Sequence, residues 1–439
     1  MTTDGGVRRP PRVTADIYRR RRLVAMTLIT VLVIAGFALL SSRGGGNPGA
    51  NGLPADGSSS TQSGNPGKTA SSPTTTHARR VVKMMFTGDT LIHSALYNQA
   101  QTYGAKSGKA YDFNPMFDKV RPIISSADVA ICHQETPLTA DDKQLSGYPV
   151  FSTPHEIADA LFNAGYDGCS TASNHSFDRN IQGITDTTTV FEQVGLKQSG
   201  MARTPEENAK ATIYTANGVT IAHLAYSYGL NGYTLPADKQ WLVRLIDKGK
   251  ESPADQPYTS QFILADAKAA RAAGADLVVI SIQWGVEYQS KPTPSEVTLA
   301  NELLASPDID LVVGHHPHVI QPIDRVGDKY VVFGVGNFLS NQAPVADPTL
   351  PAASQDGVIV DVTFTESDVN GVFKTTKVGY TPTWVDRAGY IITPVAAALK
   401  DPSTPAVTKT ALQQSWQRTT TAINADGAAE KGVAPTAVP

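Results

Sequence analysis

Residues that could carry out metal or acid–base chemistry are concentrated at a few points along this chain. Three of its nine histidines, His315, His316 and His318, fall within four residues. Imidazole, carboxylate and amide oxygen together form a ligand set that suits Zn, Mn or Fe better than a thiolate site would. Further polar side chains follow apolar runs of strand length, at the point where each run stops: Asp89, His133, Glu135, Asn174, His175, Gln283, Glu287 and Asn337.

The elements that must position these side chains are predicted to form an α/β domain with buried, mixed sheets. Apolar runs of strand length alternate with helix-like stretches, which is typical of α/β domains. Hairpins are expected at Asn217–Gly218 and around 368–371, so part of the sheet system is antiparallel. Because the carboxyl ends of the strands form the ligand crevice, the polar residues should meet at one rim. The runs cover residues 81–86, 127–132, 166–172, 275–282, 309–314 and 330–336.

Each motif has a plainer explanation when it is taken alone. A Gly-Asp pair after a strand is commonly a turn or a helix cap, and an Asn-His pair can be a turn. His93 follows Asp89 by four residues and is either a ligand or acid/base, or a histidine on a helix face. Trp284 is expected to form a wall of the substrate pocket. The joint arrangement favours a metal site, in which Asp89 or Glu135 would bridge a pair of ions roughly 3.5–4 Å apart.

Composition excludes several classes of protein. The formal net charge is −3, and the first 40 residues hold seven arginines and two aspartates, so the rest of the chain is acidic. Broad electrostatic capture of nucleic acid is therefore not expected. The two cysteines, Cys132 and Cys169, form no CxxC pair, which argues against a zinc–thiolate site. Both end strand-like runs, and a buried strand position or a disulfide between neighbouring strands remains open.

The N-terminal segment predicts a single-pass membrane anchor. Leu23–Leu40 contains no charged residue and would span about 27 Å as a helix, close to the thickness of the bilayer core. Four arginines directly precede it, so residues 1–22 are expected in the cytoplasm and the main domain outside the cell. A cleaved signal peptide is the alternative, but no clear cleavage site follows the apolar run.

The remaining boundaries follow from composition. Residues 41–80 are rich in Gly, Ser, Thr and Pro and are predicted to form a disordered linker. The α/β domain is expected over residues 81–395. Residues 396–439 are predicted to add a helix and a disordered tail. The chain contains no GxxxxGK[ST] nucleotide loop, so any ligation of a polymer would depend on a partner protein.

The motifs, taken together and in order, resemble the CapA family of capsule or poly-γ-glutamate biosynthesis proteins, which is related to the calcineurin-like metallophosphatases. The resemblance covers roughly residues 81–390. It is carried by six motifs: Thr87-Gly88-Asp89, Glu135-Thr136-Pro137-Leu138, Ser173-Asn174-His175-Ser176-Phe177-Asp178, Trp284-Gly285-Val286-Glu287-Tyr288, Gly314-His315-His316-Pro317-His318 and Gly336-Asn337-Phe338.

This resemblance implies a four-layer α/β/β/α sandwich of the metallophosphatase type, with one or two divalent ions (Mn, Fe or Zn) at one edge. His175 and His93 would be catalytic, with His175 acting as an acid or electrostatic stabiliser. Asn337, Trp284 and Glu287 would contact the substrate. The implied metal ligands are Asp89, Glu135, Asn174, His316 and His318, with His133, Gln283 and His315 as further candidates.

Two positions depart from the family pattern. His133 stands where the family commonly has Asn, and Gln283 stands where it often has His. Because an amide is a poor ligand for a transition metal, one metal position is expected to be weaker. His133 and Glu135 lie two residues apart, so on a strand their side chains share a face and His133 could compensate.

Three functions follow as expectations. The first is a membrane-anchored component that makes, exports or anchors an anionic polymer such as poly-γ-glutamate, together with synthetase or export subunits. The second is a free-standing metal-dependent hydrolase of phosphoesters or of the polymer. The third is a binding or assembly module without metal. The external domain is acidic, so a bound metal would have to supply the positive charge that attracts an anionic polymer.

Overall fold

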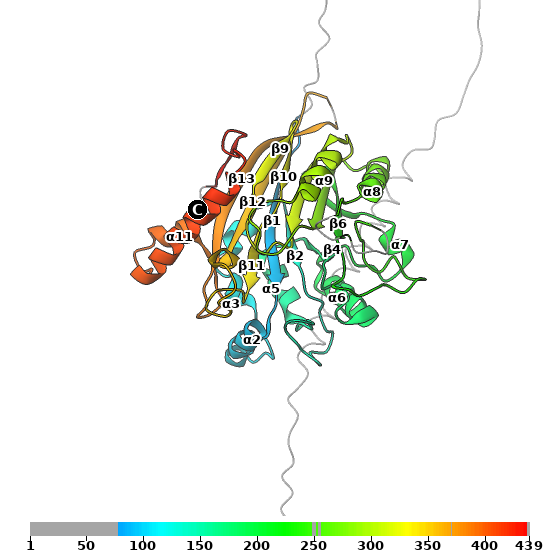
Figure 1. Cartoon of the computed structure of the whole chain (residues 1–439). Coiled ribbons are helices and arrows are strands. Elements are labelled where there is room, and N and C mark those ends of the chain that lie inside the picture. Colours follow the sequence, from blue (N-terminus) through cyan, green and yellow to red (C-terminus); the bar gives the residue numbers. More distant parts are fainter. Residues whose placement is uncertain (1–77, 248–251, 253–255, 370, 437–439) are drawn as a thin grey trace, which may run out of the picture. The chain divides into compact units, whose positions relative to one another are not determined.

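The computed structural model describes residues 78–247, 252, 256–369 and 371–436. The strands of this part form two sheets that lie in the middle of the molecule, with α8 and α11 on opposite sides (Figure 1). The first sheet has the order β14-β13-β12-β1-β2-β3-β4, and β11 and β15 pair with β1 and β13. Its strands are β1 (Val81–Leu91), β2 (Val129–Gln134), β3 (Gly168–Ser170), β4 (Lys197–Ser199), β11 (Asn337–Ser340), β12 (Asp356–Glu366), β13 (Phe373–Val385), β14 (Ile392–Pro394) and β15 (Val433–Pro435).

The second sheet has the order β5-β6-β7-β8-β10-β9. Both sheets are mixed: β1 to β4 run parallel, as do β6, β7, β8 and β10, whereas β5, β9, β12, β13 and β14 pair antiparallel. The expectation of mixed sheets is therefore confirmed. The strands are β5 (Thr212–Ala216), β6 (Val219–Ser227), β7 (Leu277–Gln283), β8 (Leu311–His315), β9 (Ile323–Val326) and β10 (Lys329–Val332).

Alternation of side chains along the strands separates the core into layers. In β1, Met84 and Phe86 pack into a cluster shared by the two sheets, whereas Met85 faces helices. In β7, Val279 joins the shared cluster and Ile280 faces the helices on the other side. Because successive strand residues point to opposite faces, each sheet has one face against its partner sheet and one against helices.

Helices cover both outer faces, which completes a helix–sheet–sheet–helix arrangement. The first sheet is covered by α2 (Ser94–Ser107), α3 (Asn114–Phe117), α4 (Arg121–Ile124), α5 (Glu156–Ala164) and α6 (Asn180–Val194), and the second by α8 (Gln261–Ala272) and α9 (Pro294–Ala305). The other helical segments are α7 (Pro205–Asn208), the 3-10 turn η1 (Ala352–Gln355), α10 (Val395–Lys400) and α11 (Ala406–Ile423).

Two predicted boundaries differ from the structure. Arg80, assigned to the linker, forms ion pairs with Glu366 (2.7 Å) and Asp276 (3.1 Å), so it belongs to the folded domain. The C-terminal tail was expected to be disordered, yet β15 pairs with β13 and Val433 packs between the sheets. Burial of this valine and the added strand pairing offset the ordering entropy of the segment.

The predicted anchor at 23–40 and most of the linker lie outside the described residues. Within the described part of the chain, no helix is both long and apolar enough to cross a bilayer.

The two cysteines are joined across neighbouring strands. Cys132 of β2 and Cys169 of β3 are direct partners in the parallel pairing and form a disulfide, with their Cα atoms 4.3 Å apart. Of the two alternatives that the sequence leaves open, the structure has the disulfide. The bond ties together two strands that end at the rim where the candidate ligands lie.

Candidate metal centre

The centre forms where the carboxyl ends of parallel strands from both sheets meet. On the first sheet, Asp89 of β1 is the register partner of His133 of β2. On the second sheet, Gln283 of β7 is the register partner of His315 of β8. All four side chains are buried. Strand pairing therefore fixes two pairs of polar residues, and the packing of one sheet on the other brings the pairs together.

Gly88 explains why Asp89 can reach this position. A Cβ atom on Gly88 would lie 2.0 Å from the carbonyl oxygen of Gly336, so only glycine allows the two backbones to approach. The approach lets the Asp89 N–H donate to the Gly336 carbonyl at 2.9 Å. The pairing of β1 with β2 shifts register between Phe86 and Asp89, which is the local irregularity often found beside functional sites.

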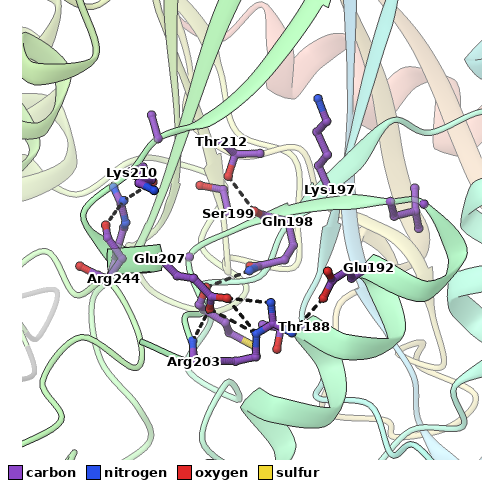
Figure 2. Close-up of a pocket in the computed structure, with 16 residues that line it drawn as sticks. Thr188, Glu192, Lys197, Gln198, Ser199, Arg203, Glu207, Lys210, Thr212 and Arg244 are labelled. Carbon is purple, nitrogen blue, oxygen red and sulfur yellow. Dashed lines mark hydrogen bonds and ion pairs between the residues drawn. The ribbon is translucent and has the colours of Figure 1, made fainter. Parts of the chain in front are cut away.

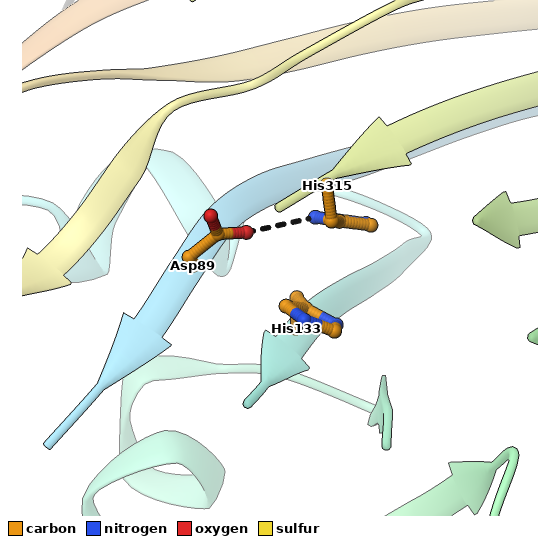
Figure 3. A group of neighbouring side chains, drawn as sticks. All are labelled: Asp89, His133 and His315. Carbon is orange, nitrogen blue, oxygen red and sulfur yellow. Dashed lines mark ion pairs between the residues drawn. The ribbon is translucent and has the colours of Figure 1, made fainter. Parts of the chain in front are cut away.

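A first group of candidate ligands consists of Asp89, His133 and His315, each offering one ligand atom within 4.8 Å of the others. Figure 3 shows Asp89 facing His315, with His133 beside them, and the His315 Nδ1 lies 3.3 Å from the Asp89 Oδ1. His133 stacks on His315 with ring centroids 4.2 Å apart. The His133 Nδ1 contacts the Ser170 Oγ at 2.7 Å, an outer contact of the kind that orients a metal-binding imidazole.

A second group consists of Glu135, His316 and His318, again with ligand atoms within 4.8 Å of one another. The backbone around Pro317 is unusual: His316 has φ 93° and His318 has φ 55°, both in the left-handed region. Non-glycine residues adopt such angles at a cost of about 1–3 kcal/mol each, and they concentrate at functional sites. This backbone turns both imidazoles toward Glu135.

Asp89 connects the two groups. Its Oδ1 faces His315, whereas its Oδ2 lies 3.0 Å from the Nδ1 of His318. The other ring nitrogen of His318, Nε2, lies 3.7 Å from the Glu135 Oε1. Of the two carboxylates expected to bridge a pair of ions, Asp89 therefore has the better placement.

Burial and mutual contact shift the pKa values of these groups strongly. Burial raises the pKa of Glu135 to about 7 and lowers the pKa of His316 to about 3. Burial also opposes the charged forms of Asp89 and His318, yet their contact outweighs it. The pKa of Asp89 is held below its ordinary range, mainly by hydrogen bonds with His315 and His318. The pKa of His318 rises to about 10, mainly through Glu135. A metal ion bound at His318 would therefore have to displace a proton.

Orphaned polar atoms test whether this donor set fits a metal ion. The Glu135 Oε2 and the His316 Nδ1 are buried and have no hydrogen-bond partner among the described residues. Buried polar atoms normally have a partner, and an ion is one explanation when they do not. Two carboxylates and four imidazoles are also ligands that Zn, Mn and Fe accept. The residues present thus fit a divalent metal.

Gln283 contacts one residue of each ligand group, and Asn174 contacts Gln283. The Gln283 Nε2 lies 3.3 Å from the His133 Nε2 and 3.2 Å from the Glu135 Oε1, and its Oε1 accepts the Asn174 N–H at 2.7 Å. Gln283 therefore turns its NH₂ group, which cannot ligate a metal, toward the centre. The side chain of Asn174 donates to the Asn231 Oδ1 at 3.1 Å. Its predicted role as a ligand stays a prediction.

The two predicted catalytic histidines lie on either side of a phenylalanine. The Phe151 ring packs edge-on against His175, with centroids 4.7 Å apart, and against His93 at 5.2 Å. The His175 Nδ1 contacts the Asp178 Oδ2 at 2.8 Å, which leaves its Nε2 as the ring nitrogen available for chemistry. Burial lowers the pKa of His93 to about 4, so this side chain is neutral near pH 7.

Two of the expected substrate contacts have other roles in the structure. Trp284 is fully buried, and its indole N–H donates to the Phe333 carbonyl at 2.9 Å, so it belongs to the core. Asn337 is also fully buried, and its Oδ1 lies 3.1 Å from the His318 Nδ1. We therefore correct both assignments: Trp284 packs in the core, and Asn337 orients His318. The third expected contact, Glu287, does line a cavity beside the centre.

That cavity contains residues that the sequence analysis did not single out as functional. Its volume is about 300 Å³, and it reaches Asn174 and His175. In the sequence, Asp178 is the last residue of the Ser173–Asp178 motif, and its spacing of three from His175 was the available clue. Asn231 and Tyr233 come from a loop with no chemical pattern in the sequence. The lining consists of Tyr148, Pro149, Val150, Asn174, His175, Asp178, Asn231, Tyr233 and Glu287.

Two other polar clusters are already satisfied by their own contacts. A cavity of about 470 Å³ contains Arg203, which pairs with Glu192 at 2.9 Å and Glu207 at 2.7 Å (Figure 2). A third group of potential ligands, around His155, is only partly buried, and the His155 Nδ1 pairs with Asp142 at 2.8 Å. We assign no functional role to either cluster.

The chain is similar to bacterial proteins that are named for the synthesis of a capsule or of a glutamate or glutamine polymer. Over 239 residues the chain is 27% identical to the capsule biosynthesis protein CapA of Bacillus anthracis, an overlap of 53% of this chain and 55% of that protein. It is 27% identical over 288 residues to the PGA biosynthesis protein CapA of Bacillus subtilis, covering 63% and 68%. A probable polyglutamine synthesis accessory protein of Mycobacterium tuberculosis is 26% identical over 225 residues, covering 49% and 57%. The chain thus spans little more than half of the Bacillus anthracis relative.

Solved structures show a more distant likeness. The calcineurin-like phosphoesterase YfkN of Bacillus subtilis aligns with a TM-score of 0.42 and 12% identity, over 78% of this chain and 98% of that one. A novel phosphatase of Mycoplasma pneumoniae aligns with a TM-score of 0.39 and 12% identity, over 70% and 94%. We base no conclusion on similarities at these TM-scores.

The family itself is established by a match that spans most of the α/β domain. A family model described as the bacterial capsule synthesis protein PGA_cap matches residues 83–342, which is more than half of the chain. The matched segment contains both candidate ligand groups, from Asp89 to His318. The resemblance to the CapA family is thereby confirmed, and the chain belongs to the bacterial capsule synthesis protein family.

Proposed function

We propose that this protein is a metal-dependent hydrolase that takes part in the biosynthesis, export or anchoring of a capsule-type anionic polymer such as poly-γ-glutamate. The pathway is supported by the family and by relatives named as capsule or PGA biosynthesis proteins. The reaction type is supported by the site. One observation carries it: two buried ligand groups are connected through Asp89, whose Oδ1 faces His315 of the first group and whose Oδ2 faces His318 of the second.

Each side chain has a place in this proposal. Asp89, His133 and His315 would hold one ion, and Glu135, His316 and His318 the second, with Asp89 between them. Ions bound there would polarise the scissile group and lower the pKa of a bound water molecule. His175, oriented by Asp178, would donate a proton to the leaving group. Asn337 and Ser170 would hold His318 and His133 in position.

We also propose that the protein acts at the outer face of the cell membrane. The support is the uncharged segment Leu23–Leu40 with its preceding arginines, which would place the folded domain outside. The disulfide between Cys132 and Cys169 agrees with an oxidising compartment. A polymer synthetase or exporter in the same membrane would be the natural partner, because this chain contains no GxxxxGK[ST] loop for nucleotide binding.

A second candidate function is a binding or assembly module that works without metal. The observation in its favour is Gln283, which points an NH₂ group toward His133 and Glu135 where a ligand would be expected. Such a module would recognise the polymer without cleaving it.

The metal content of the purified full-length chain, in mild detergent, separates these candidates. Plasma mass spectrometry should find about two equivalents of Mn, Fe or Zn after reconstitution, and hydrolysis of a phosphodiester or a γ-glutamyl anilide should depend on them. One equivalent would mean that only one group of ligands binds an ion. No bound metal under any reconstitution would refute the hydrolase and favour the binding module.

A further inference from the structure

The cavity beside the metal centre has an unusual charge for a site expected to serve an anionic polymer. Its lining includes two carboxylates, Asp178 and Glu287, and among the described residues that form it there is neither lysine nor arginine. Glu287 is exposed at the mouth, whereas the Asp178 side chain is 1% exposed. An anionic group without a neighbouring cation, such as a phosphate or an isolated carboxylate, would be repelled by both side chains on entering this cavity.

The carboxylate of Asp178 is only partly hydrogen-bonded. Its Oδ2 accepts from the His175 Nδ1 at 2.8 Å and from the Phe151 backbone N–H at 2.7 Å. Its Oδ1 is buried and has no hydrogen-bond partner among the described residues. An ionised carboxylate can accept about four hydrogen bonds, and leaving a buried oxygen unpaired is costly. Asp178 lines the cavity, so a donor bound there is an available partner for its carboxylate group.

The walls of the cavity suit a positively charged donor. Tyr148 and Tyr233 line it and remain 78% and 38% exposed, which is high for aromatic rings. Aromatic faces attract ammonium groups, and the attraction adds to that of nearby carboxylates. The volume of about 300 Å³ is at the small end of ligand pockets, so it fits a group about the size of one amino-acid residue.

We propose that this cavity binds the primary ammonium group of an amino-terminal residue, so that the substrate is a peptide or amino-acid polymer with a free amino end. This inference rests on the proposed hydrolase function, because the cavity reaches His175 and Asn174 at the edge of the metal centre. The ammonium group donates to the Asp178 carboxylate and faces Glu287, while the first amide of the polymer lies toward His175. The site then acts at the amino end of a polymer instead of along its anionic length.

Binding of two matched probes to the full-length protein tests this proposal. The probes are γ-glutamyl-glutamate with a free amino group and its N-acetyl derivative, titrated by calorimetry at pH 7. We expect the free amine to bind at least about tenfold more tightly, since only the free amine can donate a hydrogen bond between charged groups to Asp178. Glu287→Gln should reduce that ratio about threefold, because an exposed ion pair contributes at most about 1 kcal/mol. Glu302→Gln, an exposed glutamate of α9 outside the cavity, is the control and should leave the ratio unchanged.

The experiment distinguishes failure of the ammonium-binding proposal from failure of the hydrolase proposal. Both probes are titrated with the metal-loaded protein and again after chelation, and metal content is measured on the same samples. Bound metal without any preference for the free amine, or without binding of either probe, would overturn this inference and leave the hydrolase standing. A preference that persists in protein unable to bind metal would support the cavity and refute the hydrolase. A tighter complex with the acetylated probe would also overturn the inference.

Discussion

The shared position of Asp89 predicts that a single isosteric substitution weakens both metal sites. Asp89→Asn keeps the size of the side chain but removes its charge and replaces one oxygen with an NH₂ group. In the wild-type structure, the Asp89 Oδ1 lies 3.3 Å from the Nδ1 of His315 and its Oδ2 3.0 Å from the Nδ1 of His318. Because these histidines belong to different ligand groups, the substitution alters a contact with each group.

The size of the effect can be bounded. Loss of an outer contact to a metal ligand typically lowers metal affinity about 10- to 100-fold. Loss of a ligand itself should cost at least as much, so we expect each site to weaken by about 100-fold or more, which equals about 2.7 kcal/mol per site. His316→Ala, by comparison, should weaken the second site far more than the first, because His316 is in only one group.

The assay is equilibrium dialysis of the full-length protein against Mn or Zn over a range of concentrations, followed by plasma mass spectrometry. Asp361→Asn is the matched control, since Asp361 is a buried aspartate of the same sheet that pairs with Lys377 and is in neither ligand group. Circular dichroism confirms that each variant is folded. If Asp89→Asn loses one equivalent and keeps the other at unchanged affinity, Asp89 does not bridge. If both equivalents remain, the metal lies elsewhere.

Two further predictions concern Gln283 and Glu296. The Gln283 Nε2 lies 3.3 Å from the His133 Nε2 and 3.2 Å from the Glu135 Oε1, so Gln283→His should replace this inward NH₂ group with an imidazole and raise metal affinity about tenfold. Unchanged affinity in dialysis would place residue 283 outside the ligand shell. Burial raises the pKa of Glu296, the third residue of α9 and the partner of the N-cap Thr293 in a capping box, from 4.5 to about 7. The folded protein therefore binds this proton more tightly than the unfolded chain, so stability should fall as pH rises from about 4.5 to 7. Glu296→Gln, which can still cap the helix, should abolish that decline and raise the free energy of unfolding at pH 8 by about 1–3 kcal/mol relative to wild type. Urea denaturation of both proteins at pH 5 and pH 8 measures this. The same difference in unfolding free energy between the two proteins at both pH values would contradict the prediction.

Local sequence patterns predicted most of the fold. Apolar runs 81–86 and 275–282 became β1 and β7, and Asn217–Gly218 turns the hairpin between β5 and β6, because alternation and turn chemistry are short-range properties. The tail at 433–435 was missed because the strand has only three residues, of which Val433 alone is buried, and so short a segment shows no alternation.

The candidate site was predictable in its residue types and only partly in its grouping. The resemblance to the family named Asp89, Glu135, His316 and His318 as ligands, and their positions where apolar runs stop agree with a common rim. His133 and His315 were only further candidates, although the structure places both with Asp89. Their membership depends on which strands are neighbours and how the two sheets face one another. Asn337 and Trp284 were predicted to contact the substrate. Their actual partners, His318 and Phe333, could not be predicted from the spacing of residues in the sequence.

By itself, the sequence determined which residues can do chemistry, the α/β class, the family and an N-terminal segment suited to a membrane. Those properties depend on composition, on periodicity and on the order of motifs along the chain. Only the tertiary structure decided that Asp89 touches both histidine groups, that Gln283 presents its NH₂ group inward, and that Asp178 and Glu287 make the neighbouring cavity acidic. These features arise where β1 and β2 of one sheet meet β7 and β8 of the other, and such contacts are set by packing between residues more than a hundred positions apart.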